Sequence, residues 1–498
     1  MNKALLIVLC LIGGITFGQS TVFLKSYGSG GFDVGRDIKQ TLDTGYIATG
    51  SSSSFGSETA DAFLMKIDSV GTFKWSYNYG GTGSDWGEKV ILTKDSAFAL
   101  AGHTNSFGAG GFDFYLVRTT IEGEPVWEQT YGGTNWDKAY SLIQLPDSGF
   151  ALVGETYSFG EGERDVYIVR TDKNGEELWS TTWGGTLDDW ATDVDIHNDS
   201  LVISGITNSF GAGSSDGIVL KYHMDDGALG STFIIGQAGE DGFNSIIQKD
   251  TFYLMGGYRS YNHYEDCDCG KDFWIYKIDT ADFSVIADTT WNGEQLGSDI
   301  IYDVCLSANN DMFYAATTTS WGSVDIIDGY TDAFFGKFLN NYYTDFTYVK
   351  NFGEQGNDDL RGTDYCYDKG VVAVGTSPFG SLGSSNIIVI RNDRFNSGSG
   401  TTVYDMEFDI VTLSIDEDVN ETLDDFLVYP TVFSQQVFIQ GLPSVENDFI
   451  VYDMKGRMIY QDMNSTANQL ELGTLPSGYY ILKIISEQGT YTRKLVKQ

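Results

Sequence analysis

Residues 79–85 read Tyr-Gly-Gly-Thr-Gly-Ser-Asp, residues 131–137 read Tyr-Gly-Gly-Thr-Asn-Trp-Asp, and residues 183–189 read Trp-Gly-Gly-Thr-Leu-Asp-Asp. The motif recurs every 52 residues and ends in an aspartate. This aspartate belongs to a series, here called the repeat aspartates, whose members are 52 residues apart four times and then 58 and 59: Asp33, Asp85, Asp137, Asp189, Asp241, Asp299 and Asp358. A recurring period of this length indicates a repeat architecture, here with seven units.

Each unit carries the pattern of four short strands. In the first unit, an alternating stretch follows Asp33, and the turn 43–45 leads to a second apolar stretch. A Ser-Phe-Gly loop then leads to a third stretch, which starts at Asp61 and has Lys66 five positions on, and a fourth stretch carries Trp75. Four-stranded units that occur about four to eight times are typical of a β-propeller, in which neighbouring blades supply the core. The sequence therefore predicts an all-β fold with a seven-bladed β-propeller.

The seventh unit lacks its fourth strand, and the other end of the chain supplies one. This unit runs from about Phe352 to Arg391 and shows three strand patterns. Residues 21–28 match a fourth strand, with Phe23 at the position of Trp75. We therefore expect the N-terminal strand to complete the last blade and close the ring.

With these Gly-Gly…Asp and Ser-Phe-Gly…Asp signatures, the segment 19–395 resembles the bacterial seven-bladed propeller repeat family. The resemblance implies the fold. It says almost nothing about function, because propellers host many activities.

The first 18 residues read as a signal peptide. Lys3 precedes the short apolar run 4–12, and small residues at Thr16 and Gly18 suit cleavage before Gln19. No later stretch has 18 consecutive apolar residues, so we expect no membrane-spanning segment in the mature chain.

The composition changes after the propeller. Residues 396–425 read as a linker, within which 402–415 alternates in part and could form a strand. Residues 426–498 form a separate unit of short strands, the clearest at 437–439, 449–452 and 480–484, and predict a small β-sandwich.

This last unit resembles the C-terminal sorting domain of the type IX secretion system of Bacteroidota. The matching segments are Val428-Tyr429-Pro430, 451–457 (Val-Tyr-Asp-Met-Lys-Gly-Arg), 475–480 (Leu-Pro-Ser-Gly-Tyr-Tyr) and the basic end 494–497. The resemblance implies that the type IX secretion machinery is a partner of this domain. It also implies export to the medium or the outer cell surface, with removal of the tail.

The search for reactive chemistry finds no catalytic constellation. The net charge of −39 argues against nucleic acid and anionic membranes as partners. None of the four histidines has a metal-ligand spacing, and no Gly-x-Ser-x-Gly elbow occurs in an α/β context. We therefore predict no catalytic residues, no cofactor and no metal site. Calcium stays open as an alternative because carboxylate-rich loops suit it, although the spaced Asp-x-Asp-x-Asp-Gly loop is absent.

Residues that recur in every blade are interpreted as structural. We expect the repeat aspartates to bond nearby backbone N–H groups in turns. The basic residue of each third strand is expected to pair with a neighbour or to be solvated. The phenylalanines of the Ser-Phe-Gly loops recur so regularly that we expect them in the core.

The candidate ligand site lies on one face of the ring. Loops that join second to third strands and loops that join successive blades share a face in a propeller. That face carries aromatic residues beside the repeat aspartates and in a long insertion, namely Trp86, Trp136, Trp190, Tyr258, Tyr261 and Tyr264. Aromatic rings beside carboxylates suit sugar or peptide ligands, although the same rings could instead pack between blades.

Three functions follow from these observations. The first is a secreted or surface-held, non-enzymatic binding or adhesion protein whose propeller face binds glycan or protein. The second is a secreted polysaccharide-active enzyme, which needs two non-repeated carboxylates facing each other across the central channel. The third is a structural scaffold stabilised by calcium.

Overall fold

A computed structural model of the chain describes residues 22–28, 31–54, 59–260, 270–291, 297–319, 331–339, 345–352, 356–378, 385–392, 409–412, 427–429, 432–433, 435–440, 447–453, 458–465, 469–476, 478–486 and 489–497. The chain divides into two compact units, residues 1–411 and 412–498. Each unit is described by itself.

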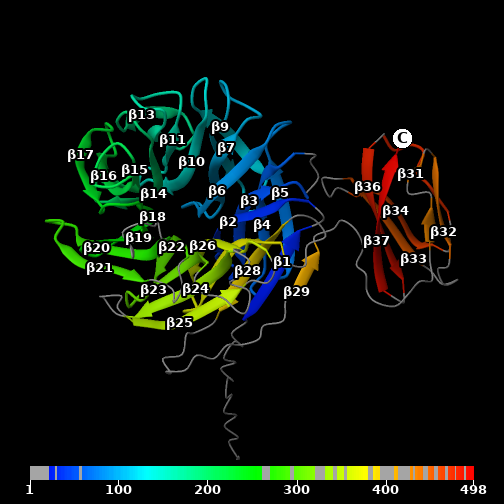
Figure 1. Ribbon diagram of the computed structural model, residues 1–498. Coiled ribbons are helices and arrows are strands. Elements are labelled where there is room, and N and C mark those ends of the chain that lie inside the picture. The colour runs from blue at the N-terminus through cyan, green and yellow to red at the C-terminus, as the bar shows by residue number, and fades with distance from the viewer. Residues whose placement is uncertain are drawn as a thin grey trace, which may run out of the picture. The chain divides into compact units, whose positions relative to one another are not determined.

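The first unit is a propeller of seven antiparallel sheets, and Figure 1 shows them arranged around a common centre. Six blades contain four strands in sequence order. Their strands are β2 (Asp33–Gln40), β3 (Tyr46–Ser52), β4 (Asp61–Ile67), β5 (Phe73–Tyr79); β6 (Asp85–Leu92), β7 (Phe98–Thr104), β8 (Asp113–Thr119), β9 (Pro125–Tyr131); β10 (Asp137–Gln144), β11 (Phe150–Thr156), β12 (Asp165–Thr171), β13 (Glu177–Trp183); β14 (Asp189–His197), β15 (Ser200–Thr207), β16 (Asp216–His223), β17 (Leu229–Ile235); β18 (Asp241–Lys249), β19 (Phe252–Ser260), β20 (Lys271–Asp279), β21 (Val285–Trp291); and β22 (Asp299–Leu306), β23 (Met312–Thr318), β24 (Asp332–Leu339), β25 (Asp345–Phe352).

The seventh blade confirms the predicted closure. It contains β26 (Asp359–Tyr365), β27 (Val371–Ser377) and β28 (Asn386–Asn392), and β1 (Phe23–Gly28) pairs antiparallel with β28. The register places Phe23 opposite Arg391 and Tyr27 opposite Ile387. A further strand, β29 (Asp409–Thr412), lies beside β1 in this sheet, within the stretch where a strand was considered.

The core lies between neighbouring blades, as the repeat pattern predicts. Second and third strands such as β11 and β12 are buried along their whole length. Val153 and Ile168 of the third blade pack in one cluster with Leu201 and Ile203 of the fourth. The first strand of each blade contacts the first strands of both neighbours, so these seven strands form the innermost ring.

Asp85, Asp137 and Asp189 of the repeat series each hold two loops together, which confirms their structural interpretation. Asp85 accepts hydrogen bonds from the backbone N–H of Gly81 at 3.0 Å and from the hydroxyl of Ser106 at 2.7 Å. It thereby ties the loop between blades to the Ser-Phe-Gly loop. Asp113, at the start of a third strand, accepts a bond from the backbone of Ala109.

In five blades, the basic residue of the third strand pairs with a carboxylate in the turn between the first two strands. Arg118 donates to Asp95 at 2.6 Å, and the arginine is buried whereas 70% of the aspartate side chain is exposed. The other pairs of this kind are Lys66–Asp43, Arg170–Asp147, Lys337–Asp311 and Arg391–Asp368.

The expectation for the Ser-Phe-Gly phenylalanines is wrong. Phe107, Phe159 and Phe210 are 46%, 43% and 41% exposed. One side of each ring rests on an aromatic neighbour, for example Phe159 on Tyr167 with 5.5 Å between ring centroids. Their recurrence therefore reflects a repeated loop, which presents an apolar ring at the surface of each of these blades.

The second unit consists of two small sheets around one core and confirms the predicted sandwich. One sheet contains β30 (Leu427–Tyr429), β32 (Gln436–Gln440) and β35 (Gln469–Glu471). The other contains β31 (Val432–Phe433), β37 (Gly489–Lys497), β36 (Gly478–Ser486), β33 (Asn447–Asp453) and β34 (Met458–Ser465). Val437 and Leu470 of the first sheet pack with Phe449, Leu482 and Leu495 of the second.

Candidate functional site

A β-bulge in the first strand of every blade supplies one side chain to the centre of the ring. In β2 the pairing with β3 passes from Gly35 to Asp37, so Arg36 has no partner. The same shift occurs once in each of the other six blades, always three residues after the repeat aspartate. A bulge re-aims a side chain in this way. The seven bulge residues are Arg36, Glu88, Tyr140, Thr192, Asn244, Tyr302 and Arg361.

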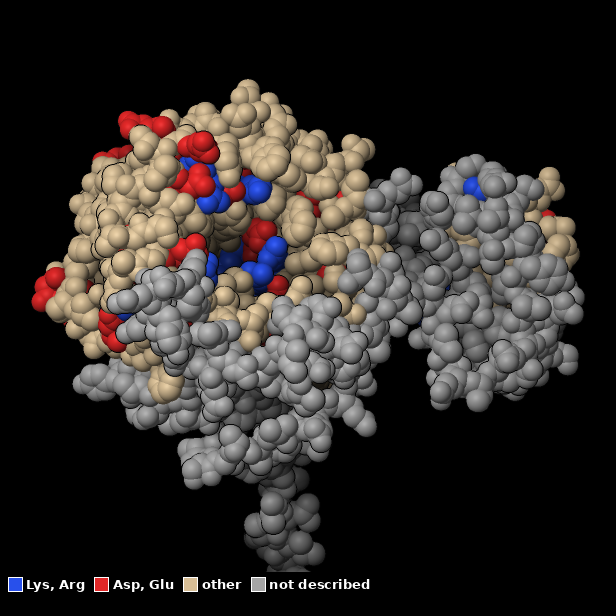
Figure 2. Space-filling model, in the orientation of Figure 1, with Lys and Arg blue, Asp and Glu red and all other residues tan. Residues whose placement is uncertain are grey.

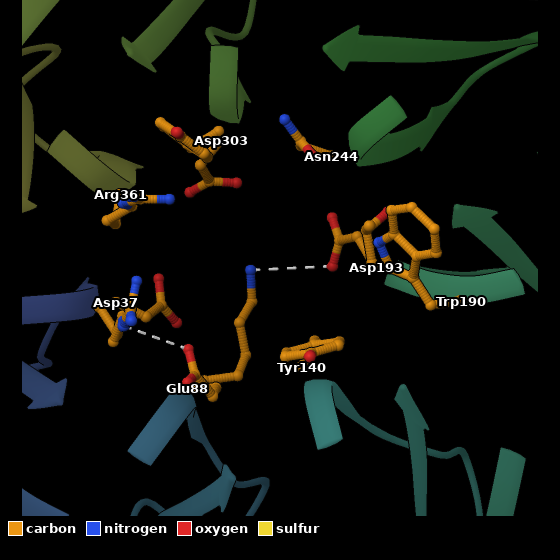
Figure 3. Close-up of a pocket in the computed structure, with 12 residues that line it drawn as sticks. Asp37, Glu88, Tyr140, Trp190, Asp193, Asn244, Asp303 and Arg361 are labelled. Carbon is orange, nitrogen blue, oxygen red and sulfur yellow. Dashed lines mark ion pairs between the residues drawn. The ribbon is translucent and has the colours of Figure 1, made fainter. Parts of the chain in front are cut away.

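All seven bulge residues line one cavity of about 270 Å³ in the central channel. Asp37, Lys89, Trp190, Asp193 and Asp303 complete its lining. Figure 3 shows these side chains directed towards the cavity from all sides of the ring. Because the bulge position carries a different side chain in most blades, the cavity is the place where the seven-fold repeat is broken.

The aspartates of the cavity also join neighbouring blades. Asp37 in the first blade accepts a bond from the backbone N–H of Val90 in the second, at 3.1 Å. Asp303 accepts in the same way from Thr363 in the next blade, at 2.8 Å. Asp193 accepts from Ile246 at 3.1 Å. These bonds hold the first strands of adjacent blades in register.

Lysine and arginine side chains gather around the hollow at the centre of the ring, as Figure 2 shows. The ammonium of Lys89 lies 3.8 Å from a carboxylate oxygen of Asp193, two blades away. Burial would lower the pKa of Lys89, but the carboxylates of Asp193, Asp37 and Asp303 outweigh it and raise the pKa well above its ordinary value. Lys89 is therefore a fixed positive charge in the cavity.

Glu88 is the carboxylate of the lining that pairs with Arg36. Its carboxylate lies 3.4 Å from Nε of Arg36, the pair that a dashed line marks in Figure 3. Burial raises the pKa of Glu88, while the charges of Arg36 and Arg361 act in the opposite direction. Both guanidinium groups therefore lie within electrostatic reach of this carboxylate.

The two arginines stack on aromatic rings at the edge of the cavity. The guanidinium of Arg361 lies 3.6 Å from the ring centroid of Tyr302, and that of Arg36 lies 5.6 Å from Trp86. Arg361 also donates from Nε to Asp359 at 2.9 Å. For Arg361, stacking and this bond fix the direction in which the guanidinium presents its terminal N–H groups.

The predicted tryptophans divide into one inside the cavity and two outside it. Trp190 lines the cavity, and Arg164 stacks on it at 3.9 Å. Trp86 stacks on His103 with 6.0 Å between centroids and is not part of the lining. Trp136 is 53% exposed and makes edge contacts with Phe112 and Tyr157.

The predicted tyrosines do not reach the cavity where they are described. Tyr258 is 8% exposed and lies under Lys271, whose ammonium is 4.1 Å from the ring centroid. Tyr261 and Tyr264 lie outside the described residues.

The sequence reasoning missed the bulge residues, although a signal for them exists. Counting three residues on from each repeat aspartate gives all seven of them. The aspartate three residues earlier is the same in every blade, whereas this position varies between charged, aromatic, hydroxyl and amide side chains. In the described part of the chain, no group of three or more His, Cys, Asp or Glu side chains is placed to hold a metal ion.

Comparison with protein families assigns the second unit. Residues 427–498 match the model described as "Secretion system C-terminal sorting domain". These residues are a type IX sorting domain. The sorting domain directs the chain to the type IX secretion machinery, and the protein is secreted to the outer cell surface or the medium. The predicted signal peptide lies outside the described residues.

Solved structures with similar folds include propellers. The chain is similar to Sqt1 from Chaetomium thermophilum (11% identity, 75% of this chain and 98% of that one, TM-score 0.43). It is also similar to the β-propeller domain of the Trilobed protease from Pyrococcus furiosus (9% identity, 76% and 97%, TM-score 0.38). At these scores the likeness carries no argument, and the propeller assignment rests on the sheet topology. No curated protein matches the chain. The described residues contain no helix long and apolar enough to cross a membrane.

Proposed function

We propose that the chain is a secreted or surface-held, non-enzymatic binding protein whose central cavity holds one sugar unit of a glycan. The observation that carries this proposal is the ring of seven bulge residues around a cavity of about 270 Å³. A space of this size suits a single small group, since pockets for larger ligands reach about 1,000 Å³.

The kinds of side chain in the cavity suit a sugar. Trp190 and Tyr302 offer aromatic surface, on which the C–H face of a sugar ring can rest. The hydroxyl of Thr192 donates to the carbonyl of Phe243 and the amide of Asn244 to that of Ile301, so their oxygen atoms are left to accept bonds from sugar hydroxyls. Tyr140 adds a third polar side chain to the lining. The site thus combines apolar surface with a few placed polar groups, as small-ligand sites do.

The hydrogen bonds that the cavity aspartates accept from the protein support binding rather than catalysis. A glycosidase needs an acid and a second carboxylate that are free to act on the bond. Here Asp37 accepts bonds from Lys39 and Val90, and Asp193 accepts from Ser141 and Ile246. Glu88, with its raised pKa, is the group in the cavity that favours the enzyme alternative.

A protein ligand is the second candidate. The exposed rings of Phe107, Phe159 and Phe210 lie on the face where the Ser-Phe-Gly loops meet the loops between blades. Apolar rings that repeat on one surface suit a protein contact.

A glycan array probed with the purified full-length chain tests the proposal. Asn244→Ala and Trp190→Ala remove cavity groups, and Trp136→Ala is a matched control because Trp136 lies on the same face outside the lining. Each variant is also checked for an unchanged melting temperature. We expect binding that the cavity variants lose and the control keeps, with no new reducing ends on the bound glycan. New reducing ends favour the enzyme, and binding unaffected by the cavity variants rejects the site.

A further inference from the structure

The three aspartates of the cavity already accept hydrogen bonds from the protein. Both carboxylate oxygens of Asp193 accept bonds, one from Ser141 at 2.7 Å and the other from Ile246 and Ser245 at 3.1 Å. Asp303 accepts from Thr363 on one oxygen, and its other oxygen lies 3.1 Å from the hydroxyl of Ser245, whose single proton it shares with Asp193. The oxygens of Asp37 are taken in the same way by Lys39 and Val90. The three aspartates therefore connect the first strands of neighbouring blades through hydrogen bonds.

The three cationic side chains of the cavity keep donors that make no hydrogen bond, whereas Thr192 and Asn244 already donate to backbone carbonyls. Within the described residues, the ammonium of Lys89 makes no hydrogen bond, and its nearest carboxylate is 3.8 Å away. Arg361 uses only Nε, in its bond to Asp359, and Arg36 makes an ion pair at 3.4 Å without a hydrogen bond. The unused hydrogen-bond donors of the cavity are therefore mainly positively charged N–H groups.

We propose that the cavity recognises a carboxylate-bearing sugar at the end of an otherwise neutral glycan, and that Arg36, Arg361 and Lys89 hold the carboxylate. This inference rests on the proposed function and names its ligand class. Guanidinium groups bind carboxylates through paired N–H groups. Stacking of Arg361 on Tyr302 presents those groups in a fixed direction.

The charge of the whole chain limits the ligand to one acidic unit. With a net charge of −39, the protein repels a polyanion before it reaches the channel. The cavity has room for about one sugar ring. A single acidic sugar that ends a neutral chain meets both conditions.

Glu88 acts as the internal counter-ion of Arg36. Its carboxylate lies 3.4 Å from Arg36, the position at which a ligand carboxylate would compete with it. Removing its charge should therefore strengthen binding of an acidic sugar, whereas removal of a catalytic acid would abolish cleavage. The two interpretations of Glu88 predict opposite results.

The test compares four immobilised oligosaccharides that differ only at the terminal unit: a uronic acid, its methyl ester, a sulfated sugar and a neutral sugar. A uronic acid polymer and a peptide with a free C-terminus complete the set. We expect the purified full-length chain to bind the uronic acid end about tenfold or more tightly than its ester. Equal binding of ester and acid overturns the inference but leaves the proposed function standing. Binding of no glycan overturns both.

The other probes distinguish the source of the charge. A stronger response to the sulfated end, to the polymer or to the peptide overturns the assignment to a terminal carboxylated sugar. Arg361→Gln should weaken binding of the uronic acid end about 10- to 100-fold and change binding of the ester little. Lys173→Gln is the matched control, because it removes one charge from an exposed turn away from the cavity.

Glu88→Gln should change the affinity in the opposite direction. We expect this variant to bind the uronic acid end about two- to fivefold more tightly, as expected when a competing ion pair is removed. An unchanged or weaker response, in a variant with an unchanged melting temperature, contradicts the assignment of Glu88 and of the carboxylate position.

Discussion

The hydroxyl of Tyr27 donates a hydrogen bond of 2.6 Å to the backbone carbonyl of Gly71, 44 residues further along the chain. Tyr79 makes the same bond to Gly123, over the same separation. Tyr79 ends the fourth strand of its blade, whereas Tyr27 belongs to the closing strand β1. The closing strand therefore reproduces the contact that a regular fourth strand makes with the next blade.

Tyr27→Phe should lower the free energy of unfolding by about 1 kcal/mol, because a buried carbonyl loses its donor. Tyr131→Phe is a matched control, since Tyr131 donates to Gly175 at 2.6 Å within the regular part of the ring. Denaturant unfolding followed by tryptophan fluorescence measures both. A loss at Tyr131 with none at Tyr27 would show that the closing junction is weaker than the others.

Leu24→Asp should open the closed ring. Leu24 is 3% exposed and packs with Ile388 and Ile390 of β28. An unpaired carboxylate there should cost about 3–5 kcal/mol. Val22 is 42% exposed, so Val22→Asp should change stability by less than about 0.5 kcal/mol. Thermal melts of the two variants check this, and similar effects at both positions would contradict the burial of β1.

Asp95→Ala should destabilise the second blade more than Arg118→Met does. The first variant leaves the buried guanidinium of Arg118 without its carboxylate, whereas the second removes the buried charge itself. We expect a difference of about 1–2 kcal/mol between the variants. Hydrogen exchange of the β6–β9 sheet locates the effect. The reverse order of stability would mean that Arg118 acts mainly through its packing.

The pH dependence of stability should contain a contribution from Asp195. Burial raises the pKa of this carboxyl from 3.8 to about 6, partly opposed by the backbone N–H of Gln248, which donates to it at 2.7 Å. Because the folded-state pKa is the higher one, this contribution is fully present below about pH 4. It is lost as the pH rises through 6, and amounts to at most about 3 kcal/mol.

Asp195→Asn should therefore flatten the melting temperature between pH 4 and pH 7, relative to the parent chain. Asp95→Ala can serve as a comparison, because the pKa of Asp95 is lowered by bonds from Thr93 and Arg118. Its loss should remove stability that is present at neutral pH and disappears on acidification. Identical pH profiles for the parent and Asp195→Asn would contradict the raised pKa.

The fold was predictable because the residues that define it repeat. The repeat aspartates occupy the same loop in each blade, and Asp85, Asp137 and Asp189 make the same bonds there, so the spacing of the series gives the number of blades. The match of residues 21–28 to a fourth strand predicted closure for the same reason. The recurrence of a residue in every blade does not show whether its side chain is buried, however. The phenylalanine of the Ser-Phe-Gly loop recurs with the blades and is nevertheless exposed.

The cavity could not be predicted in the same way because it is made of residues that differ between blades. Arg36, Tyr140 and Asn244 occupy equivalent positions with unrelated side chains. Their direction depends on a bulge, which no residue type in the sequence marks. Trp86 and Trp190 each follow a repeat aspartate, yet only Trp190 lines the cavity. The sequence indicated that tryptophans beside the repeat aspartates belong to the site, but it could not indicate which of them faces the centre of the ring.

The pairing of Phe23 with Arg391 has a consequence for the order of assembly. The last blade contains strands from both ends of the propeller, so it is complete only after β1 has paired with β28. During this delay the edge of β28 is open, and open strand edges recruit other chains into aggregates. Contacts between distant parts of a chain also form slowly. We therefore expect slow folding with an aggregation-prone interval before closure, and slow unfolding once β1 is in place.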